Sequence, residues 1–472
     1  MKLSRLLPGA ALMLLAAGCQ TSTPPVDVTP VVPEPAIAAD APVADLEVPV
    51  EYFKLDNGLK VVLSPDRTTP VATVAVYYHI GFRIEPQDRT GFAHLFEHMM
   101  FQGSQNLGKM EFIKLVQSNG GVLNGSTRFD FTNYFEIVPV HALETALWAE
   151  ADRMRGLDIT QENLTNQQGV VKNEVRVNVL NAPYGGFPWL DLPQKANTNW
   201  YNAHNFYGDL EDLDAATLSD VESFFRTYYA PNNAVVVVVG DIDVDQTAAW
   251  IRQYFGNIPS APKPQMPDIS EPRQEAEKRF VESYPRAPRP GIAVGYQAPD
   301  TDSAEYYALG LIDQILAQGN DSRLHQNLVQ SKGLTDNVGA SVNFLGNMFN
   351  IDGPTLYTIS LFHDTSNSAD RVLAAIDEEI VKLQTTPIDA ATLDLARTKM
   401  RSALYDAMEG FFGFGRADLL ASFALFYDDP ARINRIDERF AEVTPELIQK
   451  TAREYLRPTN RTILVAQPGG AS

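Results

Sequence analysis

The sequence predicts an α+β protein of two homologous α/β-roll halves, each a mainly antiparallel sheet packed by helices. Short β-rich runs alternate with helical stretches along most of the chain. The order of strand, helix and loop recurs after about 200 residues, and residues 101–104 (FQGS) align with residues 316–319 (LAQG). Eight prolines between residues 259 and 290 indicate a linker that joins the two halves.

The composition excludes several classes of protein. The chain has 472 residues, of which 44% are hydrophobic and 10% aromatic, so it can bury a large core. Its formal charge of −21 repels phosphate backbones, and we therefore expect no nucleic-acid partner. After the first twenty residues, no apolar run approaches the roughly 18 residues that span a bilayer.

The N-terminal residues 1–18 are predicted to be a secretory signal peptide. A basic start precedes a short apolar stretch, and small residues lie directly before Cys19, the only cysteine. The string Ala-Ala-Gly-Cys resembles a bacterial lipoprotein signal, in which Cys19 carries the lipid; the alternative is an ordinary cleaved signal with an incidental cysteine. The residue after Cys19 is Gln20 rather than an aspartate, which resembles the lipoprotein signals that are sorted to the outer membrane. We therefore expect a periplasmic protein of a Gram-negative bacterium, attached to the outer membrane only by a lipid anchor.

The rest of the chain divides into four parts. Residues 19–49 are rich in Pro, Ala and Val and contain no aromatic residue, which predicts an extended tether. A first half is expected over residues 50–258, the linker over residues 259–290, and a second half over residues 291–472.

Each half has a predicted series of elements. Asp56-Asn57-Gly58 between two apolar stretches predicts a hairpin over residues 53–63. Residues 71–80 (VATVAVYYHI) predict a strand that is covered on both faces. The other strands expected are residues 122–138, 234–239, 291–296 and a segment near 348–362. The helices expected are residues 88–101, 141–155, 160–179, 216–228, 306–316, 368–384, 389–410 and 444–455.

The most informative residues are His94, Glu97 and His98. On a helix, two histidines four residues apart and a glutamate three residues after the first share one face. Two imidazoles on successive turns can bind one Zn²⁺. The residues around them are apolar, so this polar stripe requires a partner or a cleft. The alternative is a chance occurrence of the H-x-x-E-H string.

This string resembles a known signature. H-x-x-E-H inverts the usual H-E-x-x-H order and is typical of the inverzincins. Together with GFAHLFEHMMFQGSQN, GGVLNGST and YYAPNNAVVVVVGDID, it resembles the pitrilysin/insulinase family of zinc peptidases, which includes the mitochondrial processing peptidases. The resemblance implies a zinc endopeptidase with one Zn²⁺ per chain, acting on peptides or unfolded segments, and it makes the first half the catalytic domain.

The resemblance also implies roles for single residues. It assigns Glu174 as the third metal ligand, with 75 residues between it and His98, and Glu97 as the general base. The alternative for Glu174 is a solvated helix glutamate; Glu162, the competing acid, suits a capping position better. Gln167 stands where family members often have a second Glu, so it can orient a ligand by a hydrogen bond but carries no charge.

The segment GGVLNGST resembles the family's edge strand, to which a peptide substrate adds as an extra strand. The substrate-binding residues implied are Asn124, Gly125, Ser126 and Thr127, with Asn124 holding the peptide backbone near the scissile bond. The alternative is a glycine-rich turn that leads into an ordinary strand.

The second half predicts a partner. Family members that work alone carry an Arg and a Tyr seven residues apart there, but the matching positions hold Val329 and Asp336, and residues 310–314 offer no second zinc site. We therefore expect a homologous subunit that supplies the Arg and the Tyr; the alternative is that Arg323 or a nearby tyrosine substitutes. Two other functions stay open, a non-catalytic assembly subunit and a peptide-binding lipoprotein with a structural zinc.

Overall fold

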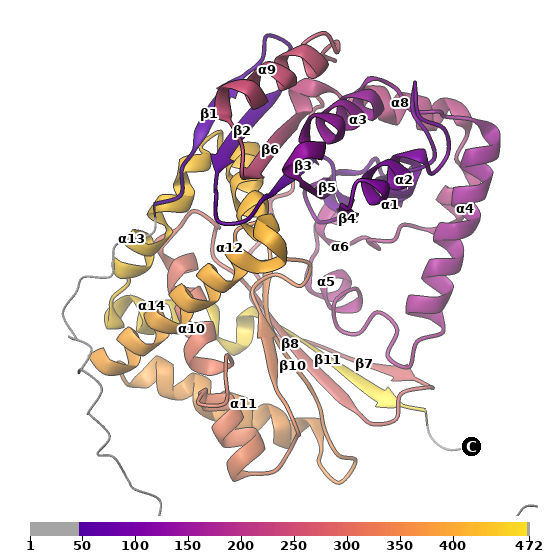
Figure 1. The fold of residues 1–472 in the computed structure, drawn as a ribbon. Coiled ribbons are helices and arrows are strands. Elements are labelled where there is room, and N and C mark those ends of the chain that lie inside the picture. Colours follow the sequence, from indigo (N-terminus) through magenta and orange to yellow (C-terminus); the bar gives the residue numbers. More distant parts are fainter. Residues whose placement is uncertain (1–46, 470–472) are drawn as a thin grey trace, which may run out of the picture. The chain divides into compact units, whose positions relative to one another are not determined.

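In the computed structural model, which describes residues 47–469, the chain forms two sheets with helices packed against them (Figure 1). The predicted α+β class with two similar halves is confirmed. The predicted signal peptide, the lipid site at Cys19 and nearly all of the tether lie outside the described residues. Within the described range, no helix combines the length and the apolar character that a membrane span requires.

The first sheet has six strands in the order β1-β2-β6-β3-β5-β4, so β4 lies at one end of it. β2 and β6 run parallel, whereas the other neighbours are antiparallel. The strands are β1 (Glu51–Lys54), β2 (Lys60–Pro65), β3 (Val71–Tyr78), β4 (Val122–Thr127), β5 (Thr132–Pro139) and β6 (Ala234–Gly240). The hairpin predicted around Asp56-Asn57-Gly58 is the β1–β2 pair.

The strand β3 is buried on both faces, as predicted. Val74 and Val76 pack against helices of the first half, while Ala75 and Tyr77 belong to the core on the opposite face. A strand buried on both sides needs no polar alternation, which explains its nearly continuous apolar sequence. The first-half helices are α1 (Phe92–Met99), α2 (Glu111–Ser118), α3 (Leu143–Arg155), α4 (Gln161–Val175), α5 (Asp191–Ala196), α6 (Trp200–Ala203), α7 (Leu210–Ala215), α8 (Leu218–Tyr228) and α9 (Val244–Phe255).

The second sheet has five strands in the order β7-β11-β8-β10-β9. Its strands are β7 (Lys278–Tyr284), β8 (Gly291–Gln297), β9 (Gly339–Ser341), β10 (Leu356–Phe362) and β11 (Arg461–Pro468). Its helices are α10 (Ala304–Leu316), α11 (Ala369–Thr385), α12 (Ala390–Tyr427), α13 (Ile436–Ala441) and α14 (Pro445–Tyr455).

Each half packs one of its helices against the sheet of the other half. α12, from the second half, lies along β2, β3 and β6 of the first sheet (Figure 1). In return, α5 of the first half packs on β8 and β11 of the second sheet. Polar contacts join the same surfaces: the Tyr77 hydroxyl donates to Asp418 at 2.8 Å, and Arg416 pairs with Asp66 at 2.8 Å. Each sheet therefore depends on the other half to bury one of its faces.

Three segments differ from the sequence-based expectation. Residues 122–138 form two strands, because the chain reverses between Arg128 and Phe131, where the Arg128 N–H donates to the Phe131 carbonyl at 2.8 Å. Residues 259–290, expected as a linker, include β7, which pairs in parallel with β11. The helix expected over residues 389–410 continues to Tyr427 as α12, although Phe411 and Gly413 have positive φ. Its C-terminal part continues because it is buried against the first sheet.

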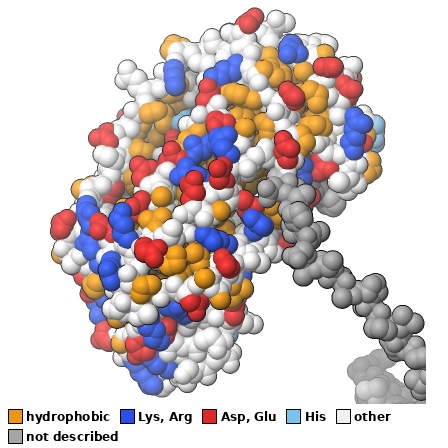
Figure 2. All heavy atoms as spheres, turned by 90° about the vertical axis from the view of Figure 1, so that its left-hand side faces the viewer, with side chains coloured by type: hydrophobic (Ala, Val, Ile, Leu, Met, Phe, Trp, Pro, Cys, Tyr) orange, Lys and Arg blue, Asp and Glu red, His pale blue; other side chains and the backbone are white. Residues whose placement is uncertain are grey.

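The surface mixes both signs of charge. On the face seen in Figure 2, acidic and basic side chains are interspersed with hydrophobic ones. Surface ion pairs such as Lys54 with Asp428 and Arg432 with Asp302 also join the two signs of charge. The charge of −21 is therefore not concentrated in one acidic patch on this face.

A buried ion network fastens α3 to the first sheet. Arg153, 1% exposed, donates to Glu150 at 2.9 Å and to Glu136 of β5 at 3.1 Å. Its guanidinium also lies over the Phe112 ring at 4.0 Å. Both glutamates are fully buried, and burial raises the pKa of Glu136 well above its usual range. The positive charge of Arg153 therefore offsets part of the free-energy cost of burying these two carboxyl groups.

We predict that Arg153→Met lowers the free energy of unfolding by about 3–5 kcal/mol, because removing one partner leaves buried carboxyl groups uncompensated. Urea denaturation followed by circular dichroism measures this loss. Arg226→Met is the control: this exposed arginine pairs with exposed Glu222 at 3.7 Å, and we expect a change below about 1 kcal/mol. Equal stability of the two variants would contradict the prediction.

Candidate metal centre

Three side chains converge where α1 meets α4. His94 Nε2 lies 3.7 Å from Glu174 Oε1, and His98 Nε2 lies 3.3 Å from Glu174 Oε2. One ligand atom from each of the three residues falls within 4.8 Å of the others. Among residues 47–469, this is the one group of three or more His, Cys, Asp or Glu with such spacing. The structure therefore brings together the three residues that the sequence analysis assigned to the metal.

The donor set fits a zinc ion. Ligand atoms about 2.1 Å from one tetrahedral zinc lie about 3.4 Å from one another, close to the two distances between His and Glu174. Burial lowers the pKa of His94 to about 4, so this imidazole is neutral and offers a lone pair. The hydrogen bond from His98 lowers the pKa of Glu174, which keeps the carboxylate charged. Two imidazoles and one carboxylate leave a fourth position open.

A buried carboxylate fixes the start of α1. The Glu85 side chain accepts the N–H groups of Gly91 at 2.9 Å and Ala93 at 2.5 Å. These are donors that no carbonyl within the helix reaches. Glu85 is fully buried, and burial raises its pKa to about 8, while the two backbone N–H groups favour its charged form. The helix that carries both histidines therefore begins at a defined residue.

The helix α4 brings Glu174 to the cluster from a distant part of the sequence. Its N-cap is Thr160, whose side chain accepts the Asn163 N–H. Glu162 lies in the exposed first turn, as expected for an acid at a helix start, and is not part of the cluster. Just after Glu174 the helix changes to a π-helix, η3 (Arg176–Leu180). Such irregular turns often occur at functional sites.

Glu97 lies next to the cluster but is not one of its members. The Thr127 hydroxyl donates to Glu97 Oε2 at 2.7 Å, and burial raises the pKa of this carboxyl group. A Cβ added to Gly125 would lie 3.4 Å from Glu97 Cγ. Thr127 and Gly125 of β4 therefore border the carboxylate that the sequence analysis assigned as general base.

The four predicted substrate-binding residues divide between the two faces of β4. Gly125 and Thr127 face α1, whereas Asn124 pairs with Phe135, whose ring stacks on Phe414 of α12. Directly paired residues of an antiparallel ladder share a face, so Asn124 and Ser126 lie on the side away from Glu97. The carboxamide of Asn124 accepts the neighbouring Gly125 N–H at 2.9 Å, and Ser126 donates to Asn133. A role for Asn124 at the scissile bond stays a prediction.

Gln167 is buried two turns before Glu174. Its amide donates to Asn166 at 2.8 Å, a neighbour on α4, rather than to a cluster residue. In the second half, Val329 lies in the π-helix η5 (His325–Ser331), and exposed Asp336 pairs with Arg289 at 2.7 Å.

Tyr207, which was not among the residues predicted for the site, also contacts the cluster. Its hydroxyl lies 3.4 Å from Glu174 Oε1, and its ring is edge-on to His94 with centroids 5.1 Å apart. Burial raises the pKa of Tyr207 to about 12, so the phenol is a hydrogen-bond donor at neutral pH. Residues 204–209 form a short irregular segment between α6 and α7, and nothing in the local sequence indicates a contact with α1.

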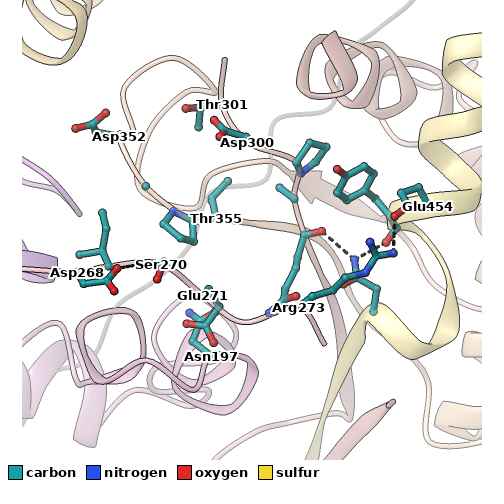
Figure 3. Close-up of a pocket in the computed structure, with 18 of the residues that line it drawn as sticks. Asn197, Asp268, Ser270, Glu271, Arg273, Asp300, Thr301, Asp352, Thr355 and Glu454 are labelled. Atoms are coloured by element: carbon teal, nitrogen blue, oxygen red, sulfur yellow. Dashed lines mark hydrogen bonds and ion pairs between the residues drawn. The ribbon is translucent and has the colours of Figure 1, made fainter. Parts of the chain in front are cut away.

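A separate cavity of about 660 Å³ is lined by the linker, two loops of the second half and the end of α14 (Figure 3). Several of its acidic side chains are already engaged. Glu454 pairs with Arg273, and Glu271 accepts the N–H groups of Thr198 and Asn199. None of the three cluster residues lines this cavity, so it does not belong to the metal centre.

Comparisons with known families agree with the position of the cluster. Residues 60–183 match the family described as Insulinase (Peptidase family M16), and residues 215–400 match the Peptidase M16 inactive domain. The first range contains His94, His98 and Glu174, while the second contains Val329 and Asp336.

Two relatives and two solved structures illustrate the similarity. Zinc protease PqqE of Helicobacter pylori is 28% identical over 432 residues, which cover 89% of this chain and 93% of that protein. Zinc protease YmxG of Bacillus subtilis, described as uncharacterized, is 22% identical over 365 residues, covering 76% and 85%. A crystal structure of a protease from Helicobacter pylori superposes with a TM-score of 0.82 at 26% identity, over 89% of this chain and 100% of that one. Pitrilysin superposes with a TM-score of 0.72 at 18% identity, over 91% of this chain but 46% of its own.

We predict that the purified chain binds about one zinc ion, and that His98→Ala and Glu174→Gln each lose most of it, because each variant removes one donor from a three-donor set. Elemental analysis after exhaustive dialysis measures the metal content. His325→Ala, in the second half, is the control and should retain the metal. Wild-type zinc content in both ligand variants would show that these residues do not bind it.

Proposed function

We propose that this chain, which belongs to the insulinase (pitrilysin) family of peptidases, is a zinc-dependent endopeptidase. His94, His98 and Glu174 bind the metal, and Glu97 is the general base. The observation that carries this proposal is the three-donor cluster with the Glu97 carboxylate, which is not one of its members, beside it. A structural zinc site is normally closed by four protein ligands, and this one offers three.

The chain's own residues then have defined tasks. The chemistry that a bound zinc supplies is polarisation of the substrate carbonyl and acidification of water. Glu97 takes the proton of the attacking water at its carboxylate and passes it to the amine nitrogen that leaves. Thr127 holds Glu97 by its 2.7 Å hydrogen bond, so the carboxylate keeps one orientation beside the cluster.

The substrate is an extended peptide or an unfolded segment. β4 ends the first sheet, and its outer edge is the side without a neighbouring strand in the described residues. A peptide that pairs with this edge is held by main-chain hydrogen bonds, which tolerate many sequences. The Gly125 and Thr127 positions border Glu97, so a peptide on β4 runs past the general base.

We further propose that the chain is the catalytic subunit of a heterodimer. It covers 46% of pitrilysin and 48% of the periplasmic protease PqqL of Escherichia coli, but 94% of a structure of the first half of PqqL. Valine and aspartate at positions 329 and 336 offer no hydrogen-bond donor to an oxyanion. A homologous chain with the Arg and the Tyr would supply the missing hydrogen-bond donors to the oxyanion.

The place of action that we propose is the periplasm, with attachment to the outer membrane through a lipid on Cys19. The support is the signal-like N-terminus ending at the only cysteine of the chain. The Pro- and Ala-rich composition of residues 19–49 predicts a tether that would let the peptidase act at a distance from the membrane surface.

We predict that Glu97→Gln retains zinc and the fold but lowers kcat by at least about 100-fold, because the amide cannot accept the water's proton. Hydrolysis of a quenched fluorescent peptide library, together with metal analysis, measures both quantities. Glu162→Gln, an exposed acid of α4, is the matched control and should leave kcat unchanged. A Glu97→Gln variant with most of the wild-type kcat would place the base elsewhere. A wild-type chain that binds zinc but hydrolyses nothing, alone or with its homologous partner, would favour a structural zinc.

We predict that the chain alone hydrolyses the library slowly, and that adding a homologous chain with the Arg and Tyr but without H-x-x-E-H raises kcat/KM at least about 100-fold, since one oxyanion donor contributes this much. Size-exclusion chromatography of the mixture checks that a heterodimer forms. Full activity from the isolated chain, as a monomer or a homodimer, would refute the need for a partner.

A further inference from the structure

Tyr207 connects the two helices that supply the metal cluster. Its hydroxyl is within 3.4 Å of Glu174 Oε1 on α4, and its ring lies edge-on to His94 of α1. Trp189 is edge-on to Tyr207, with centroids 5.7 Å apart. The phenol is thus held between an aromatic neighbour and two of the three cluster residues.

The backbone around Tyr207 is fastened to the start of α1. Gly208 has a φ of 74°, and a Cβ at this position would lie 2.2 Å from the Gly91 nitrogen. The Asp209 N–H donates to the Thr90 hydroxyl oxygen at 2.9 Å. Only glycine permits so close an approach, so the side chain of Tyr207 starts from a point fixed relative to the histidine helix.

Glu174 is the cluster residue that most needs such support. It comes from α4, its side chain is 30% exposed, and the helix becomes irregular two residues later. Within the described residues, its carboxylate contacts are those with His94, His98 and Tyr207. Imidazole nitrogens that bind a metal cannot also donate to a carboxylate, which leaves the Tyr207 hydroxyl as the protein donor to Glu174.

We propose that Tyr207 is a positioning residue of the metal centre: its hydroxyl orients the Glu174 carboxylate, and its ring fixes the His94 imidazole. This inference rests on the function proposed above, because it takes the cluster to be the zinc site. Hydrogen-bonding partners of metal ligands typically contribute about 10- to 100-fold to metal affinity. The contribution reaches the metal through Glu174, so it requires an intact ligand at that position.

The test measures zinc affinity rather than activity. The metal-free full-length chain is titrated with zinc against a chromophoric chelator, for wild type, Tyr207→Phe and Tyr254→Phe. Tyr254 is the matched control, because its hydroxyl also donates to a glutamate, Glu144, at 2.7 Å on the surface between α9 and α3. We expect the Kd for zinc to rise about 10-fold in Tyr207→Phe and to stay unchanged in Tyr254→Phe. The Tm of each metal-free variant should match that of wild type.

A mutant cycle separates positioning from a general effect on the fold. In a Glu174→Ala background the hydroxyl has no carboxylate to orient, so adding Tyr207→Phe should weaken zinc binding no further. The same loss in both backgrounds, or a wild-type Kd in Tyr207→Phe, would overturn the inference while leaving the zinc site intact. Absence of zinc binding by the wild-type chain would overturn the proposed function itself, and the inference with it.

Discussion

The burial of both faces of the first sheet is the constraint on which the rest of the structure depends. β3 and β6 are nearly continuous runs of apolar residues, and no arrangement of helices on one face alone could cover them. One face takes α1, α3, α8 and α9, and the other takes α12 from the second half. Helices that are far apart in the sequence therefore cover the two faces of one sheet, because the helices of the first half bury only one of these faces. The metal cluster lies on the first of these faces because α1 does.

The candidate metal centre on α1 places polar groups inside an apolar layer. His94, Glu97 and His98 lie on a helix whose other residues are core, and two donors at its start are satisfied by buried Glu85. A buried carboxylate at a helix N-terminus is stabilised by the partial positive charge there. Farther along the same layer, Arg153 compensates Glu136 and Glu150. The first half thus combines a strongly apolar core with a few buried polar side chains whose contacts hold α1 and α3 in place on the sheet.

The sequence predicted those elements of the fold that short-range patterns such as turn residues and hydrophobic periodicity determine. The β1–β2 hairpin, the strands β3 and β6, and helices α3, α8, α10, α11 and α14 follow from turn residues and periodicity. The 122–138 segment alternates throughout, so its reversal at Arg128–Phe131 has no clear turn residue to indicate it. The helix expected over residues 389–410 continues to Tyr427, because burial of its continuation against the first sheet outweighs the cost of Gly410, Gly413 and Gly415.

The sequence by itself determined the chemistry: two histidines and a glutamate on one face of an apolar helix, because an α-helix fixes which residues share a face. The resemblance to a known family added Glu174 as the third ligand. The 75 residues between His98 and Glu174 do not say where the Glu174 side chain points. Only the tertiary structure decided that α4 turns Glu174 toward His94 and His98, that Gln167 does not reach them, and that Tyr207 does. These contacts join segments that are far apart along the chain, so they depend on how the helices pack on the sheet rather than on any local preference.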